Sequence, residues 1–193
     1  MAIRTKVSVA SRALTMIGAD PITSLSDGTA EAIAATQHYD STVETELSLY
    51  PWSFAKNQAA LNLLVGTPAS TWEYAWQLPN ELINLVRVEV NDNTIPFERF
   101  GSKIFCNEDA DVVATYVFRA TETSWPPYFE DLIVHRLGAI FATAIAERPK
   151  LAEGLLFETQ NMRMMARNMD SASQTTSRLP VGKLRRSRLG NRS

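Results

Sequence analysis

Apolar residues recur at helical spacing over residues 127–147, the most apolar part of the chain. Eight positions separated by three or four residues share one helical face: Phe129, Leu132, Ile133, Leu137, Ile140, Phe141, Ala144 and Ile145. Apolar residues also fill most of the remaining circumference: Val134, Ala139, Ala142 and Ala146. A helix that is apolar nearly all round lies in a core rather than on a surface. We therefore predict a central helix over residues 127–147.

Three further segments have a single apolar stripe, which predicts amphipathic helices over residues 5–18, 29–50 and 150–169. The last of these has its stripe at Leu151, Leu155, Met162, Met165, Ala166 and Met169. Residues that commonly end helices follow the first two segments, namely Gly18 and Pro51.

The spacing of apolar residues changes to every second position between residues 52 and 120, which is typical of strands with one buried face. We expect strands at Phe54–Leu61, Trp72–Leu78, Leu82–Val90, Thr94–Phe100, Lys103–Cys106 and Val112–Arg119. This order predicts an α+β fold: a bundle of about four helices, with an antiparallel β insertion between the second and third helices. We expect a small sheet packed on the bundle, one domain over residues 1–170 and an extended C-terminal tail over 171–193.

Charge is distributed unevenly along the chain. The whole sequence has 19 basic and 21 acidic residues, and six of the basic ones lie in residues 174–193, which contain no acid. Thirteen basic and 21 acidic residues remain in residues 1–173, a net charge of −8. The tail is too poor in large apolar residues to form its own core, so we predict that it is disordered in the free monomer and ordered against a partner.

Three interpretations of this tail are open: a merely charged terminus, a phosphate-binding segment on nucleic acid, or a segment that docks in a protein groove. Apolar residues interrupt its charges at Leu179-Pro180-Val181 and at Leu184. This pattern favours a protein groove with apolar pockets and acidic walls.

The sequence contains none of the enzyme motifs GxSxG, HExxH, CxxC or a glycine-rich phosphate loop. We expect His38 to be solvated and His135 to form a local hydrogen bond or ion pair with Asp131. Cys106 is the single cysteine, which excludes an intrachain disulfide. We expect a solvated acidic helix face at Asp40, Glu44 and Glu46. The sequence therefore predicts neither an enzyme nor a cofactor or metal site, and its apolar tracts predict no signal peptide and no membrane span.

Methionine and tryptophan are concentrated in particular segments. Met162, Met165 and Met169 form an apolar patch together with Met164, and either core packing or an adaptable subunit interface would explain it. We expect all four tryptophans to join the bundle to the sheet: Trp52, Trp72, Trp76 and Trp125.

Four motifs in the same order over residues 8–170 resemble the tail tubular protein A family of short-tailed bacteriophages. They are Leu14-Thr15-Met16-Ile17-Gly18-Ala19-Asp20-Pro21-Ile22 with Ser24–Gly28, Tyr50-Pro51-Trp52-Ser53-Phe54-Ala55, Tyr74-Ala75-Trp76-Gln77-Leu78-Pro79, and Trp125-Pro126-Pro127-Tyr128-Phe129. The segment Ser177–Gly182 resembles the C-terminal strap of a related class of adaptors, which lies along the portal protein. This sequence differs from the longer tubular proteins of that family in having a basic C-terminal end.

The resemblance implies a structural virion protein: a head-to-tail adaptor, made in the host cytoplasm, that forms a ring of usually twelve copies. Its implied partners are the portal protein, a tail nozzle such as tail tubular protein B, and DNA that crosses the lumen without specific recognition. Twelve bodies of charge −8 would carry on the order of −96, which would keep DNA from adhering.

The resemblance, the tail composition and the methionine patch together give the expected contact residues. Portal binding is assigned to Arg178, Leu179, Pro180, Lys183, Leu184, Arg185, Arg186 and Arg188. The subunit interface is assigned to Met162, Met165 and Met169. The alternative is a nucleic-acid-binding accessory protein that uses the same basic tail.

Overall fold

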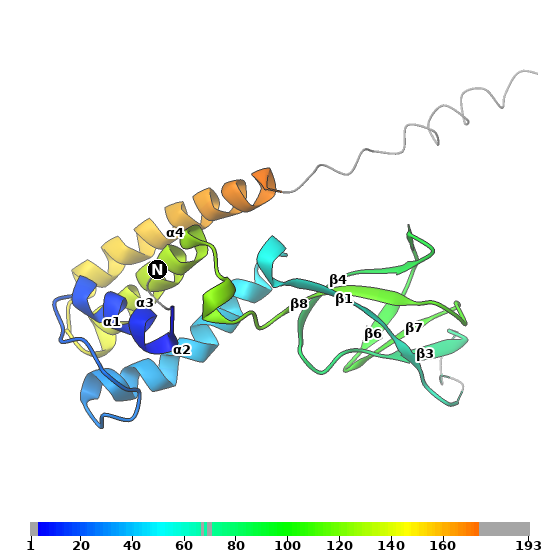
Figure 1. Cartoon of the computed structure of the whole chain (residues 1–193), viewed down its shortest axis with the longest axis horizontal. Helices are drawn as coiled ribbons and strands as arrows, with labels where there is room; N and C mark the ends of the chain where they lie inside the picture. Colours follow the sequence, from blue (N-terminus) through cyan, green and yellow to red (C-terminus); the bar gives the residue numbers. More distant parts are fainter. Residues whose placement is uncertain (1–3, 67, 69–70, 174–193) are drawn as a thin grey trace, which may run out of the picture.

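The computed structural model describes residues 4–66, 68 and 71–173. Its helices are α1 (Lys6–Met16), α2 (Ala30–Ser48), α3 (Pro127–Ala144) and α4 (Pro149–Ala172), with short 3-10 helices η1 (Ser53–Ala55) and η2 (Glu122–Ser124) (Figure 1). The four helices lie where the sequence predicts them, and every boundary agrees within three residues.

Local signals account for the helix ends. Thr5 and Ser8 form a capping box at the start of α1, and the Thr29 side chain accepts a hydrogen bond from the Ala32 amide at the start of α2. Proline occupies the first turn of α3 and of α4, where no amide donor is needed. Gly18 follows α1 with a φ of 79°, a left-handed conformation that glycine adopts without steric cost.

Helix α3 is the centre of the bundle, as its all-round apolar pattern predicts, and it packs against α1, α2 and α4. An aromatic cluster closes the end of the bundle nearest the β insertion. In it the Phe129 ring lies 5.1 Å from Trp52, 5.1 Å from Trp125 and 4.8 Å from Phe54, centroid to centroid. Both indoles are fully buried, and their N–H groups donate to the carbonyl oxygens of Glu46 and Ala120.

The β insertion between α2 and α3 consists of two antiparallel four-stranded sheets. One has the order β1-β8-β4-β5, with β1 Lys56–Ala60, β8 Val113–Phe118, β4 Leu82–Val90 and β5 Asn93–Thr94. The other has the order β2-β3-β7-β6, with β2 Asn62–Leu63, β3 Tyr74–Gln77, β7 Lys103–Cys106 and β6 Glu98–Phe100. The fold is α+β, with the insertion in the predicted place.

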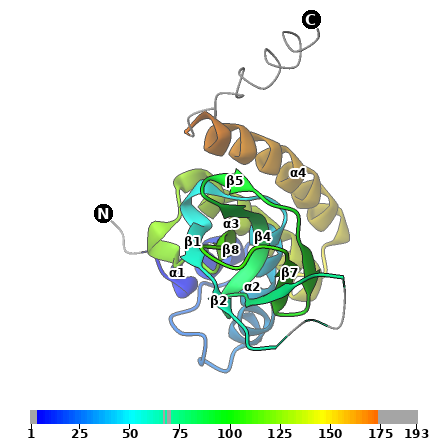
Figure 2. The same cartoon turned by 90° about the vertical axis from the view of Figure 1, so that its right-hand side faces the viewer.

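The insertion has its own hydrophobic core and extends away from the bundle (Figures 1 and 2). Its buried residues include Leu61, Trp76, Leu78, Val88, Ile104, Cys106, Val112 and Ala114. The expectation of one small sheet lying on the bundle is therefore wrong. Trp76 belongs to this second core, and the Trp72 indole donates to Glu98 within the insertion. Two of the four tryptophans thus do not join the bundle to the sheets.

A proline divides the strand that the alternation predicts over residues 94–100. The chain pairs with β4 at Asn93–Thr94, leaves the ladder at Pro96, and resumes as β6 in the other sheet. Proline has no amide hydrogen to donate to a ladder, so the strand ends there. Ile95 and Phe97 on either side pack into the core between the sheets.

Candidate interaction surface

The exposed positions of α4 between Gly154 and Met169 are almost without charge, whereas Lys150 and Glu153 are exposed in its first turns. Ten residues between Gly154 and Met169 are exposed, and Glu158 is the one charged residue among them. Large apolar side chains occupy much of this surface: Phe157 is 66% exposed, Met164 59%, Met165 63% and Met169 54%. Uncharged polar residues, Gln160, Asn161 and Asn168, lie between these apolar side chains. An exposed apolar patch with a polar surround is typical of a surface that binds another chain.

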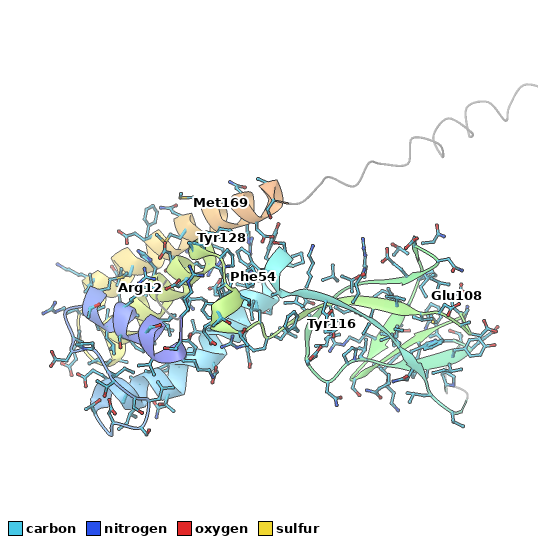
Figure 3. The ribbon with its side chains drawn as sticks, viewed as in Figure 1. Arg12, Phe54, Glu108, Tyr116, Tyr128 and Met169 are labelled. Carbon is cyan, nitrogen blue, oxygen red and sulfur yellow. The ribbon has the colours of Figure 1, made fainter. Side chains whose placement is uncertain are left out.

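A shallow apolar groove runs between α4 and the first turns of α3. Its volume is about 230 Å³, and it is lined by Pro127, Tyr128, Asp131, Met162, Met165, Ala166 and Met169. Figure 3 shows Tyr128 and Met169 on neighbouring helices at this side of the bundle. Of the three predicted interface methionines, Met162 is half-buried, while Met165 and Met169 project into solvent. Core packing therefore does not account for Met165 and Met169.

A buried carboxylate fixes the C-terminal end of α4. Asp170 is fully buried and accepts hydrogen bonds from the Ser53 amide at 3.1 Å, the Ser53 hydroxyl at 2.6 Å and the Tyr128 hydroxyl at 2.9 Å. Burial, with the hydrogen bond to Asp170, raises the pKa of Tyr128 to about 12. These bonds join α4, α3 and η1 at the point where the β insertion begins.

A buried ion pair fixes the middle of α4 to α2. The Arg163 guanidinium donates to both carboxylate oxygens of Glu46, at 2.9 and 2.5 Å, and Glu46 is 1% exposed. The hydrogen bond to Glu46 raises the pKa of Arg163. The expectation that Glu46 belongs to a solvated acidic face is wrong, because the helix turns this residue inward while Glu44 stays exposed.

The described part of the chain is rich in paired charges. Arg4, Lys6, Arg12, Arg87, Arg119 and Arg163 each form an ion pair with a carboxylate. Asp40 on α2 receives the Lys6 ammonium at 2.7 Å. Burial opposes ionisation of Asp40, but the Lys6 and Arg119 contacts outweigh it and lower its pKa.

The side chains considered for catalysis have structural surroundings. The Nδ1 atom of His135 lies 2.8 Å from the Asp131 carbonyl oxygen one turn earlier, which is the local contact that the sequence predicts. His38 is half-exposed on α2. Cys106 is buried in the second core, and that burial raises the pKa of its thiol. Within the described residues, no cluster of His, Cys, Asp and Glu could hold a metal ion.

None of the helices in the described ranges has the length and apolar character needed to cross a membrane.

The eight tail residues assigned to portal binding lie outside the described residues. Sequence reasoning missed Phe157, which extends the apolar face of α4, and it missed Asp170 and the Glu46–Arg163 pair. The helical spacing of Phe157, Met164 and Met165 could have indicated that Phe157 lies on the same face of α4.

Comparison with known families finds no family model that matches this chain, and comparison with curated proteins finds no match.

Proposed function

We propose that this chain is a head-to-tail adaptor subunit of a short-tailed bacteriophage, which assembles into a closed ring between portal and tail nozzle. The observation that carries the proposal is the exposed, nearly uncharged surface of α4 between Gly154 and Met169, with its five large apolar side chains. Such a face needs a partner surface in the assembled state. The resemblance of residues 8–170 to the tail tubular protein A family supports the neighbouring subunit as that partner.

The arrangement of the bundle suits a ring. Helix α4 lies on one side of α3, and the N-terminal half of α2 lies on the other (Figure 1). The α4 face of one subunit would therefore contact a different face of the next, a head-to-tail contact that closes by rotation. Ile33 on α2, 51% exposed, lies in this second region. The β insertion would then point toward the nozzle, and residues 178–188 would bind the portal.

The acidic body supports passage of DNA rather than binding of DNA. The net charge of −8 lies within residues 4–173, because residues 1–3 have no charged side chain and the other charged residues belong to the basic segment 174–193. A lumen of like charge would repel the phosphate backbone.

The test mixes the protein with isolated portal rings and follows assembly by sedimentation and electron microscopy. Changing Arg185, Arg186 and Arg188 to Glu should abolish binding to portal rings, whereas changing them to Lys should preserve it. Changing Phe157 and Met164 to Glu should leave portal binding but prevent ring closure, whereas changing both to Leu should not. Normal rings from both Glu variants would refute the proposal.

A titration with duplex DNA separates the adaptor from a nucleic-acid-binding accessory protein. Tight binding to naked DNA that weakens steeply with salt, without assembly on portals, would favour the second function.

A further inference from the structure

The apolar groove between α3 and α4 lies next to the start of the basic segment 174–193. The groove is bounded by Met169 at one end and Met162 at the other. The described chain reaches Ser173, four residues beyond Met169, and the side chain of Ser173 is hydrogen-bonded back to the Asp170 carbonyl. Whatever follows Ser173 therefore starts beside the groove.

We infer, in place of the expectation that the whole tail is disordered in the free monomer, that residues 178–189 of the same chain bind this groove in the free subunit. From Met162 to Met169, α4 advances about 10 Å at 1.5 Å per residue. The six residues from Ser173 to Leu179 can extend about 20 Å at about 3.3 Å per residue, so a chain that reverses directly after α4 can place Leu179 over the part of the groove between Met165 and Met169.

The chemistry of the two surfaces is complementary. The groove presents methionine side chains, which adapt to different apolar partners, and the segment supplies Leu179, Val181 and Leu184. Acidic groups lie along the groove and its continuation. The Asp131 carboxylate lines the groove, pairs with Arg12 at 2.8 Å and has a side chain that is 47% exposed. Glu158, one turn before Met162 on α4 and outside the groove lining, has a side chain that is 60% exposed. The segment between Arg178 and Arg188 is basic, with no acid.

The covalent connection favours the segment of the same chain over that of a second copy. A short flexible connection gives an effective concentration of about 1 mM, far above a micromolar protein solution. An intrinsic dissociation constant of about 0.2 mM would then leave the groove occupied about five-sixths of the time.

The consequence for assembly rests on the proposed function. Residues that bind the portal would be the same ones that cover the methionine groove, so portal binding would withdraw them and expose α4 to the next subunit. Ring formation would then begin on the portal rather than in solution. The intramolecular contact itself does not depend on that function.

Thiol labelling of cysteine variants tests the contact, and the buried Cys106 gives little background. Met165→Cys reports on the groove. Met164→Cys is the matched control, because Met164 is exposed to a similar degree but does not line the groove. Each variant is compared in the full chain and in a chain ending at Ser173. Occupancy of five-sixths slows labelling of M165C about sixfold in the full chain and leaves M164C unchanged.

Three results would overturn the inference. They are equal labelling of M165C in the two chains, equal slowing of M164C and M165C, and protection that increases with protein concentration, which would mean binding between copies.

Methyl spectra of the unsubstituted chain give a second measurement. Removing residues 174–193 should shift the Met162, Met165 and Met169 signals more than that of Met164, and Leu179→Ser with Leu184→Ser should reproduce the shift. Loss of ring formation on portals with protection of M165C retained would refute the proposed function alone.

Discussion

Asp170→Asn tests whether the buried carboxylate holds the end of α4 against the β insertion. The substitution preserves shape but replaces one acceptor oxygen with an NH₂ group, which faces a donor from Ser53 or Tyr128. A hydrogen bond to a charged group contributes about 1.5–3 kcal/mol. Relief from burying a charge offsets part of this loss, so we expect the free energy of unfolding to fall by about 2 kcal/mol. For a chain of this size that corresponds to a decrease in Tm of about 4–8 °C.

Urea denaturation, followed by tryptophan fluorescence, measures the change. Hydrogen exchange should also show faster exchange of the amides in residues 167–173 than of those in α3, because the substitution releases the end of α4 first. Glu153→Gln makes the same chemical change at an exposed position of α4 and should alter stability by less than about 0.5 kcal/mol. An Asp170→Asn chain as stable as the Glu153→Gln chain would refute the assigned role of Asp170.

Two further predictions concern other buried polar groups. Arg163→Met leaves the Glu46 carboxylate buried without its cation and should lower the free energy of unfolding by about 3–5 kcal/mol, whereas adding Glu46→Gln should recover part of the loss. Equal stability of the single and double variants in urea would contradict this. Burial and the hydrogen bond to Glu81 raise the pKa of Tyr116 to about 12, above its value near 10 in an unfolded chain. The resulting stabilisation is complete below pH 10 and is lost as the pH rises toward 12, so wild-type stability should fall more steeply over this range than that of Tyr116→Phe. Parallel slopes in denaturation series at several pH values would count against this assignment.

The helices could be predicted because each has a strong periodic signal and a local stop. Helix α3 is apolar nearly all round, and Pro149 begins the next helix close behind it. The strand Leu82–Val90 and the strand Lys103–Cys106 were predicted with the observed bounds, since turns flank both. Asn91 and Asp92 both have positive φ values in the predicted turn.

The errors have a common physical origin, because they concern which side of a segment faces which neighbour. Alternation over residues 94–100 does not reveal that Pro96 transfers the chain between two sheets. Nor does the charge of Glu46 reveal that Arg163, 117 residues away, neutralises it inside the bundle.

The candidate surface was partly predictable. The spacing of Met162, Met165 and Met169 indicates a common side of α4, and the structure places all three along one groove. Their exposure depends on how α4 is rotated about its axis, and Asp170 and Arg163 fix that rotation through contacts distant in sequence. Local periodicity contains no information on such contacts.

The bonds between Asp170 and Ser53 also determine how the molecule would respond to a mechanical load. A force applied beyond Ser173 acts on the last turn of α4. The hydrogen bonds of Asp170 transmit it to Ser53, in the first residues after α2, from which the chain continues into the sheets. The force would therefore load the junction between the two hydrophobic cores before it loaded the N-terminal end of α4. A partner that holds the C-terminal segment would thereby also restrain the junction between the helical bundle and the β insertion.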